Sequence, residues 1–123
     1  MNVKNFNDGQ REALLDLATL AMYADGRLTA VEDERVQRLL TTMGFTTDYD
    51  RNKHYDASVS RVSRHSATAA AARKHASALA LSFSTKEQRR QVHDVLNDLM
   101  SSDGGVAPEE SKLLAAVREA LKM

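Results

Sequence analysis

The sequence has no cysteine or tryptophan, one proline, five glycines and few aromatic residues. Without cysteine it has no disulfide, no thiolate nucleophile and no cysteine-ligated zinc site. Alanine and leucine are abundant instead, and they favour helix, whereas a sheet draws on β-branched and aromatic side chains. The composition therefore predicts a helical protein that does not depend on covalent cross-links.

Net charge and long apolar runs are also missing. Seventeen basic and seventeen acidic side chains balance to a formal charge of zero, so no overall field attracts nucleic acid or an anionic membrane. The apolar runs are far shorter than the roughly 20 residues of a membrane span, and the first residues lack the apolar core of a signal peptide. We expect a cytoplasmic protein that does not insert into a membrane and does not bind nucleic acid.

Apolar side chains recur at helical spacing through most of the 123 residues, and no segment alternates apolar and polar residues as a strand does. Asn7 or Asp8 can cap the first helix. We read residues 45–57, which lack a clean period, as a connection. The expected helices run from about residue 8 to 25, from 29 to 44, over 58–82 with a break near 65–68, from 84 to 103, and from 108 onwards.

One pattern occurs twice, at an offset of 78 residues (103 minus 25). Asp25-Gly26 aligns with Asp103-Gly104, and Glu32 aligns with Glu110, so both copies read Asp-Gly-x-aliphatic-x-x-x-Glu between two amphipathic helices. Duplication of such a unit indicates that each copy needs a partner to cover its apolar face. We predict one compact, all-α, multi-helix domain over residues 1–123. Its pseudo-repeated helix–turn–helix units span about 8–44 and 84–122, and a connection and an alanine-rich helical segment join them.

The repeated pattern matches the second half of a calcium-binding EF-hand loop, with its aspartate, its glycine turn and its final glutamate. The first half is missing, since Ala21 and Leu99 stand where the leading oxygen ligands belong. The remaining carboxylates suit a weak, water-rich site for Mg²⁺, Ca²⁺ or Mn²⁺. The same side chains can equally act as helix caps and accept hydrogen bonds from turn amides. Both interpretations stay open for Asp25, Glu32, Asp103 and Glu110.

The stretch Leu17-Ala-Thr-Leu-Ala-Met-Tyr-Ala-Asp-Gly-Arg-Leu-Thr-Ala-Val-Glu32 resembles the tellurite-resistance TerB-like family, and so does the stretch from Leu96 to Glu110. The likeness covers most of the chain but not residues 46–57. It implies a compact all-helical domain whose acidic Asp-Gly turns are proposed to bind divalent metal. It also implies a link to tellurite and general stress responses, or use as a module in larger bacterial proteins. The positions that match the family's acidic residues are Asp25, Glu32, Asp103 and Glu110.

The middle of the chain is basic, with Arg61, Arg64, Arg73 and Lys74 close together in sequence. Such a face can dock an acidic protein partner, or it can be an ordinary solvated helix surface. The pattern leaves a homodimer open as well.

Residues with catalytic spacing are absent from the sequence. The four histidines show no ligand spacing, no serine or threonine lies in a nucleophile elbow, and no glycine-rich phosphate loop follows a strand. An enzyme would need a general base beside a nucleophile or a metal-bound water. We therefore expect a non-catalytic TerB-like binding module that holds a divalent cation weakly. The alternative is a structural adaptor that docks a protein partner through the basic middle helix.

Overall fold

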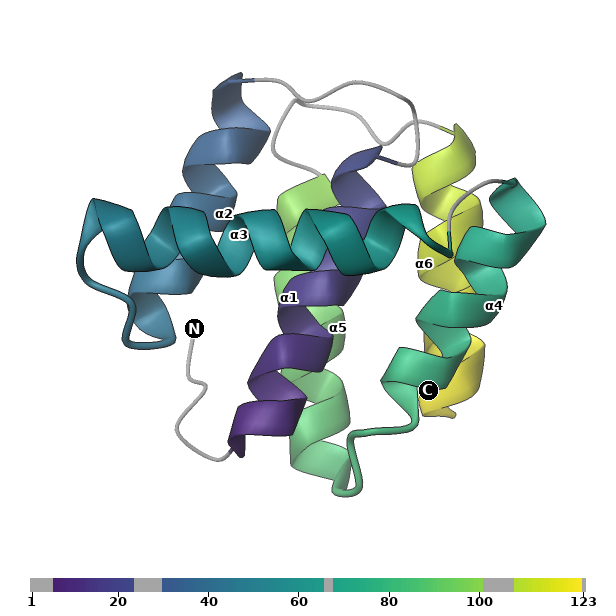
Figure 1. The fold of residues 1–123 in the computed structure, drawn as a ribbon. Helices are drawn as coiled ribbons and strands as arrows, with labels where there is room; N and C mark the ends of the chain where they lie inside the picture. The colour runs from purple at the N-terminus through teal and green to yellow at the C-terminus, as the bar shows by residue number, and fades with distance from the viewer. Residues whose placement is uncertain (1–5, 24–29, 66–67, 101–107, 123) are drawn as a thin grey trace.

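The computed structural model describes residues 6–23, 30–65, 68–100 and 108–122, which contain six α-helices and no strand (Figure 1). The all-α prediction is confirmed. The helices are α1 (Asp8–Tyr23), α2 (Ala30–Thr42), α3 (Asp48–Ser63), α4 (Ala69–Ala80), α5 (Lys86–Met100) and α6 (Pro108–Leu121).

Helix α1 is the centre of the fold. All nine residues from Ala13 to Ala21 are buried, whereas the sequence predicted a single apolar stripe. Helix α3 crosses in front of α1, α5 runs behind it, and α2 and α4 flank it (Figure 1). Because neighbours cover α1 on every side, its polar residues Asp16 and Thr19 are buried together with its leucines.

Helices α1 and α5 run in the same direction and begin side by side. Asn7 Oδ1 accepts a hydrogen bond of 2.8 Å from the amide of Gln10, and Thr85 Oγ1 accepts one of 3.1 Å from the amide of Gln88. The side-chain amides of Gln10 and Gln88 then pair with each other at 3.3 Å in both directions. The two helix caps are thus joined through one buried contact.

Ser84 and Glu87 have the spacing of a capping box in the sequence, but the cap of α5 lies one residue later. Thr85 is the cap, and Gln88 Oε1 accepts hydrogen bonds from the amides of Ser84 and Thr85. Glu87 is exposed, whereas Gln88 is buried, because only Gln88 faces α1.

The predicted connection at 45–57 was also wrong, because most of it belongs to α3. Thr47 caps this helix by accepting a hydrogen bond of 3.1 Å from the amide of Asp50. The first turns of α3 are mainly exposed and polar, so they carry no apolar period. The sequence does contain one sign that a helix begins here: Thr47, a residue type that caps helices, is followed by the acidic residues Asp48 and Asp50 in the first turn.

The alanine-rich segment divides where the break was predicted, and α4 starts after the cap at Thr68. Ala76 and Ala80 are fully buried, and α4 packs against α6. Small side chains allow this close approach. On α6 the inner face is Leu113, Val117 and Leu121, and Leu114 is only half-buried.

Helices α1 and α5 both end towards the top of Figure 1, and α2 and α6 both begin there. The Asp-Gly segments that connect these helices fall outside the described ranges. The prediction that they form a structural repeat stays a prediction. No helix within the described ranges is long and apolar enough to span a membrane.

The position of the α5 cap can be tested by two single substitutions. Thr85→Ala should lower the free energy of unfolding by about 1 kcal/mol, because the amide of Gln88 loses its acceptor. Ser84→Ala, one residue earlier, should change it by less than about 0.5 kcal/mol. Urea denaturation measures both, and a larger loss for Ser84→Ala would place the cap at Ser84 instead.

Candidate functional site

The four carboxylates predicted as metal ligands cannot be placed. Asp25 and Asp103 lie outside the described residues, as do the side chains of Glu32 and Glu110 near the starts of α2 and α6. Over the described part of the chain, no group of three or more histidine, aspartate or glutamate residues is arranged to hold a metal ion. The metal site at these carboxylates therefore stays a prediction.

A buried carboxylate, Asp16 on α1, forms the strongest polar cluster that the structure describes. Its side chain is 4% exposed. Arg61 of α3 binds it in bidentate fashion, with Nε 2.9 Å from Oδ2 and Nη2 2.8 Å from Oδ1. Ser58 Oγ donates a hydrogen bond of 2.6 Å to Oδ1. A buried charge needs such partners, because transfer of an unpaired carboxylate from water is costly.

A fourth residue, Thr19, extends this cluster. Its Oγ1 lies 2.9 Å from Ser58 Oγ. The Thr19 hydroxyl also donates a hydrogen bond of 2.9 Å to the carbonyl oxygen of Leu15. We call Asp16, Ser58, Thr19 and Arg61 the Asp16 network. It fixes α3 against α1.

Arg61 is held from two sides. Besides Asp16 it meets Glu12, with Nε 3.3 Å from Oε1. The hydrogen bond to Asp16, and then the charges of Asp16 and Glu12, raise the pKa of Arg61 although burial opposes this. Arg61 was predicted to contact a partner, but the structure uses its guanidinium inside the chain.

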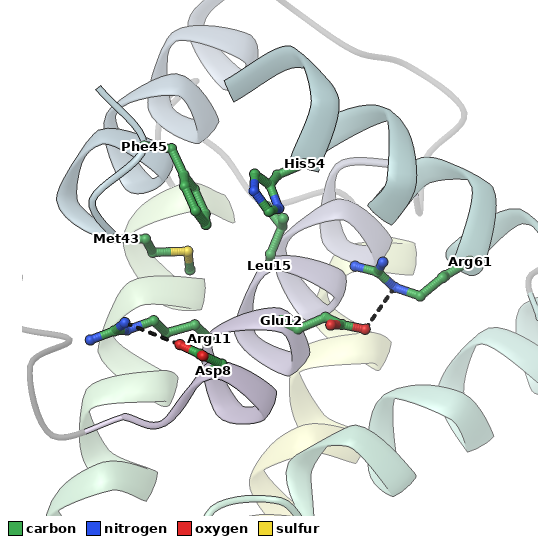
Figure 2. Close-up of a pocket in the computed structure, with 8 residues that line it drawn as sticks. All are labelled: Asp8, Arg11, Glu12, Leu15, Met43, Phe45, His54 and Arg61. Carbon is green, nitrogen blue, oxygen red and sulfur yellow. Dashed lines mark ion pairs between the residues drawn. The ribbon is translucent and has the colours of Figure 1, made fainter. Parts of the chain in front are cut away.

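A pocket of about 320 Å³ opens beside Arg61, between α1 and the corner that joins α2 to α3 (Figure 2). Leu15, Met43 and Phe45 give it an apolar wall, and the ring of His54 stacks on Phe45 with centroids 3.8 Å apart. Its charges come as pairs. Asp8 lies 3.5 Å from Arg11 and Glu12 lies 3.3 Å from Arg61. The two carboxylates and the two arginines of the pocket therefore neutralise each other in pairs.

The other predicted basic residues lie around α4. Arg64 caps the end of α3 and is exposed, Lys74 is exposed, and Arg73 is half-buried. Arg64 and Lys74 line one hollow together with His65 and His75. The structure thus brings two of the four predicted residues together, and it separates Arg61 from them.

Asp16 and the two stacked histidines were missed from the sequence. The signal for Asp16 is that it is the single charged residue in the apolar run from Ala13 to Ala21. His65 and His75 stack with ring centroids 4.1 Å apart, but they belong to different elements and ten residues separate them. Helical spacing in the sequence cannot predict a contact that depends on the angle between α3 and α4.

His75 has a lowered pKa. Burial is the main cause, the neighbouring His65 adds to it, and the charge of Asp16 opposes it. One ring nitrogen, Nε2, is buried and has no hydrogen-bond partner among the described residues. The neutral imidazole is therefore the form that the folded protein favours.

Removing Arg61 tests the Asp16 network. Arg61→Ala should lower the free energy of unfolding by roughly 3 kcal/mol, because Asp16 stays buried without its cation. Arg38→Ala removes an arginine from the exposed pair with Glu34 and should cost less than about 1 kcal/mol. Urea denaturation measures both. Additive losses in a cycle of Asp16→Ala, Arg61→Ala and the double variant would show that the two residues do not interact.

Stability should fall on mild acidification because of His75. Its folded pKa lies below the ordinary value of 6.5, so the unfolded chain takes up the proton first as the pH drops through 6.5. The contribution of His75 is complete above this pH and declines below it. The free energy of unfolding should therefore drop less between pH 7.5 and 5.5 in His75→Gln than in the parent. An equal drop would refute this, and His54→Gln provides the control.

The comparisons with known proteins identify the family. A model of the family described as tellurite resistance protein TerB matches residues 11–123. No curated protein and no solved structure is similar enough to the chain to count as a match. The family match spans all six helices except the first turn of α1, and it agrees with the resemblance at the two Asp-Gly patterns. The chain belongs to the TerB family.

Proposed function

We propose that this chain is a non-catalytic TerB module that binds a divalent cation at its two Asp-Gly turns, through Asp25, Glu32, Asp103 and Glu110. The observation that supports the proposal is the common direction of α1 and α5. Both helices end, and both following helices begin, at the same end of the molecule (Figure 1). Two acidic turns that leave from one end are able to contribute to a single site.

The donor chemistry fits a hard cation. The four side chains offer carboxylate oxygens and no nitrogen or sulfur, and oxygen ligands are those that Mg²⁺, Ca²⁺ and Mn²⁺ prefer. Each turn supplies only two carboxylates, about half of what a calcium loop provides. A shared site would combine the two halves, and water would fill the remaining positions.

The family gives this binding its context. TerB is named for tellurite resistance, and we propose a role in the response to tellurite or to general stress, in the cytoplasm. A module that reports the presence of a cation to a protein partner needs no chemistry of its own. This agrees with the balanced pocket in Figure 2, where each carboxylate is paired with an arginine.

The alternative, an adaptor that docks a protein through its basic middle residues, loses one of its four cations. Arg61 is already bonded to Asp16 and Glu12, so it has little capacity left for a partner. Arg64, Arg73 and Lys74 remain for such a surface. The proposed metal site does not depend on any of these basic residues.

Thermal unfolding with and without cations tests the proposed site. After chelation, millimolar Mg²⁺, Ca²⁺ or Mn²⁺ should raise the melting temperature by several degrees, because a ligand that binds only the folded state stabilises it by mass action. Asp103→Ala with Glu110→Ala should abolish the rise, and Asp25→Ala with Glu32→Ala should do the same.

A matched control removes two other carboxylates. Asp56 on α3 and Glu119 on α6 are exposed, and their double alanine variant should keep the full rise. The assignment fails if the rise persists without Asp103 and Glu110, or if it is lost equally in the control. No rise with any of the three cations would leave the four carboxylates as helix caps.

A further inference from the structure

A second hollow, at the corner between the end of α3 and α4, has a different character from the pocket in Figure 2. It measures about 350 Å³ and is lined by Arg64, His65, Ala71, Lys74, His75 and Ala78. We call it the corner hollow. Among the residues that the structure describes, its lining has two permanent cations, two imidazoles and two alanines, and no acidic residue.

The cations of the corner hollow are not neutralised. Neither Arg64 nor Lys74 forms an ion pair with any carboxylate in the described ranges. In the pocket of Figure 2, by contrast, both arginines face a carboxylate within 3.5 Å. Cations that converge on one concavity without acidic partners repel each other. An anion between them would relieve this repulsion.

The stacked imidazoles favour an anion over a metal. A metal ion lies about 2 Å from each nitrogen and in the plane of each imidazole that binds it. The rings of His65 and His75 lie 4.1 Å apart and only 19° from parallel, so their planes do not converge on a shared ion. An imidazole N–H, however, donates a hydrogen bond to an anion, and Nε2 of His75 has no hydrogen-bond partner among the described residues.

We propose that the corner hollow binds a phosphoryl group, a compact anion with several acceptor oxygens. The guanidinium of Arg64 suits two of these oxygens, since its planar fork matches phosphate geometry. Lys74 supplies a second charge, and the imidazole of His65 supplies donors. The hollow is much larger than the roughly 30 Å³ that one water molecule takes up, so it has room for a phosphoryl group with a small organic substituent beside Ala71 and Ala78.

A phosphoryl group fits this site better than an acidic peptide does. An extended peptide places successive side chains of one face about 7 Å apart and would need a row of cations along one helix. Here the cations surround a single concavity. This inference goes beyond the cation site at the Asp-Gly turns and does not rest on it, because none of the residues is shared.

NMR titration with anions tests the proposal. Sulfate is the first probe, since its charge stays constant between pH 5.5 and 8. It should shift the backbone signals of Ala71 and Ala78 and the ring signals of His65 and His75, with millimolar affinity. Arg64→Gln with Lys74→Gln should weaken the binding at least tenfold. Lys53→Gln with Arg90→Gln, which also removes two exposed basic residues, should leave it unchanged.

The pH dependence gives a second readout. The charged groups that act on His75 are His65 and Asp16, and Arg64 and Lys74 share its hollow. Sulfate should bind at least threefold more tightly at pH 5.5 than at pH 8, because an anion in the hollow favours the protonated form of the His75 imidazole that lines it. His65→Gln with His75→Gln should abolish this difference. The proposal is overturned if sulfate shifts signals at basic residues all over the surface, or if the Arg64/Lys74 variant binds as the parent does.

Phosphate and a phosphomonoester distinguish the source of the phosphoryl group. At pH 8 both are doubly charged, and both should compete with sulfate. Tighter binding of glycerol phosphate than of inorganic phosphate would identify an organic phosphate as the ligand, whereas equal binding would identify the free anion. Competition by a poly-glutamate peptide but by neither phosphate would instead assign the corner hollow to an acidic protein and refute the proposal.

Discussion

The burial of residues 13–21 of α1 on every side is the constraint on which the rest of the structure depends. This part of the helix has no solvent face, so Asp16 and Thr19 must find partners inside the protein. α3 supplies these partners through Ser58 and Arg61. The requirement fixes the position of α3 across α1, and with it the location of the pocket in Figure 2 and of the corner hollow at the far end of α3.

A second contact sets the direction of the two helices that lead to the acidic turns. The caps of α1 and α5 meet through the paired amides of Gln10 and Gln88, and the tilted rings of Phe6 and Phe83 pack beside them at 5.2 Å. Helices that start together and run in parallel also end together. The contact at one end of the molecule therefore supports the proposal that the Asp-Gly turns share a site at the other.

Sequence periodicity predicted the elements whose packing is apolar, and it failed where packing is polar. Leu14 on α1, Val92 on α5 and Val117 on α6 each belong to a series of apolar residues at helical spacing, and each is fully buried. The first part of α3, residues 48–57, was missed because its side chains are mainly exposed and polar and show no apolar period. The contact of Gln88 with Gln10 is also polar, so a pattern of apolar residues does not reveal it. The stacking of His65 on His75 depends on an interhelical angle that no local rule supplies.

Paramagnetic broadening by Mn²⁺ tests most directly the proposal that both acidic turns bind one cation. At substoichiometric Mn²⁺, the amide signals of Tyr23 and Ala30 should broaden together with those of Met100 and Glu109. Signals of Gln10 and Gln88, at the opposite end of α1 and α5, should stay sharp. Broadening around one turn alone would contradict a shared site. Broadening centred on residues away from both turns would contradict the assignment of the four carboxylates as ligands.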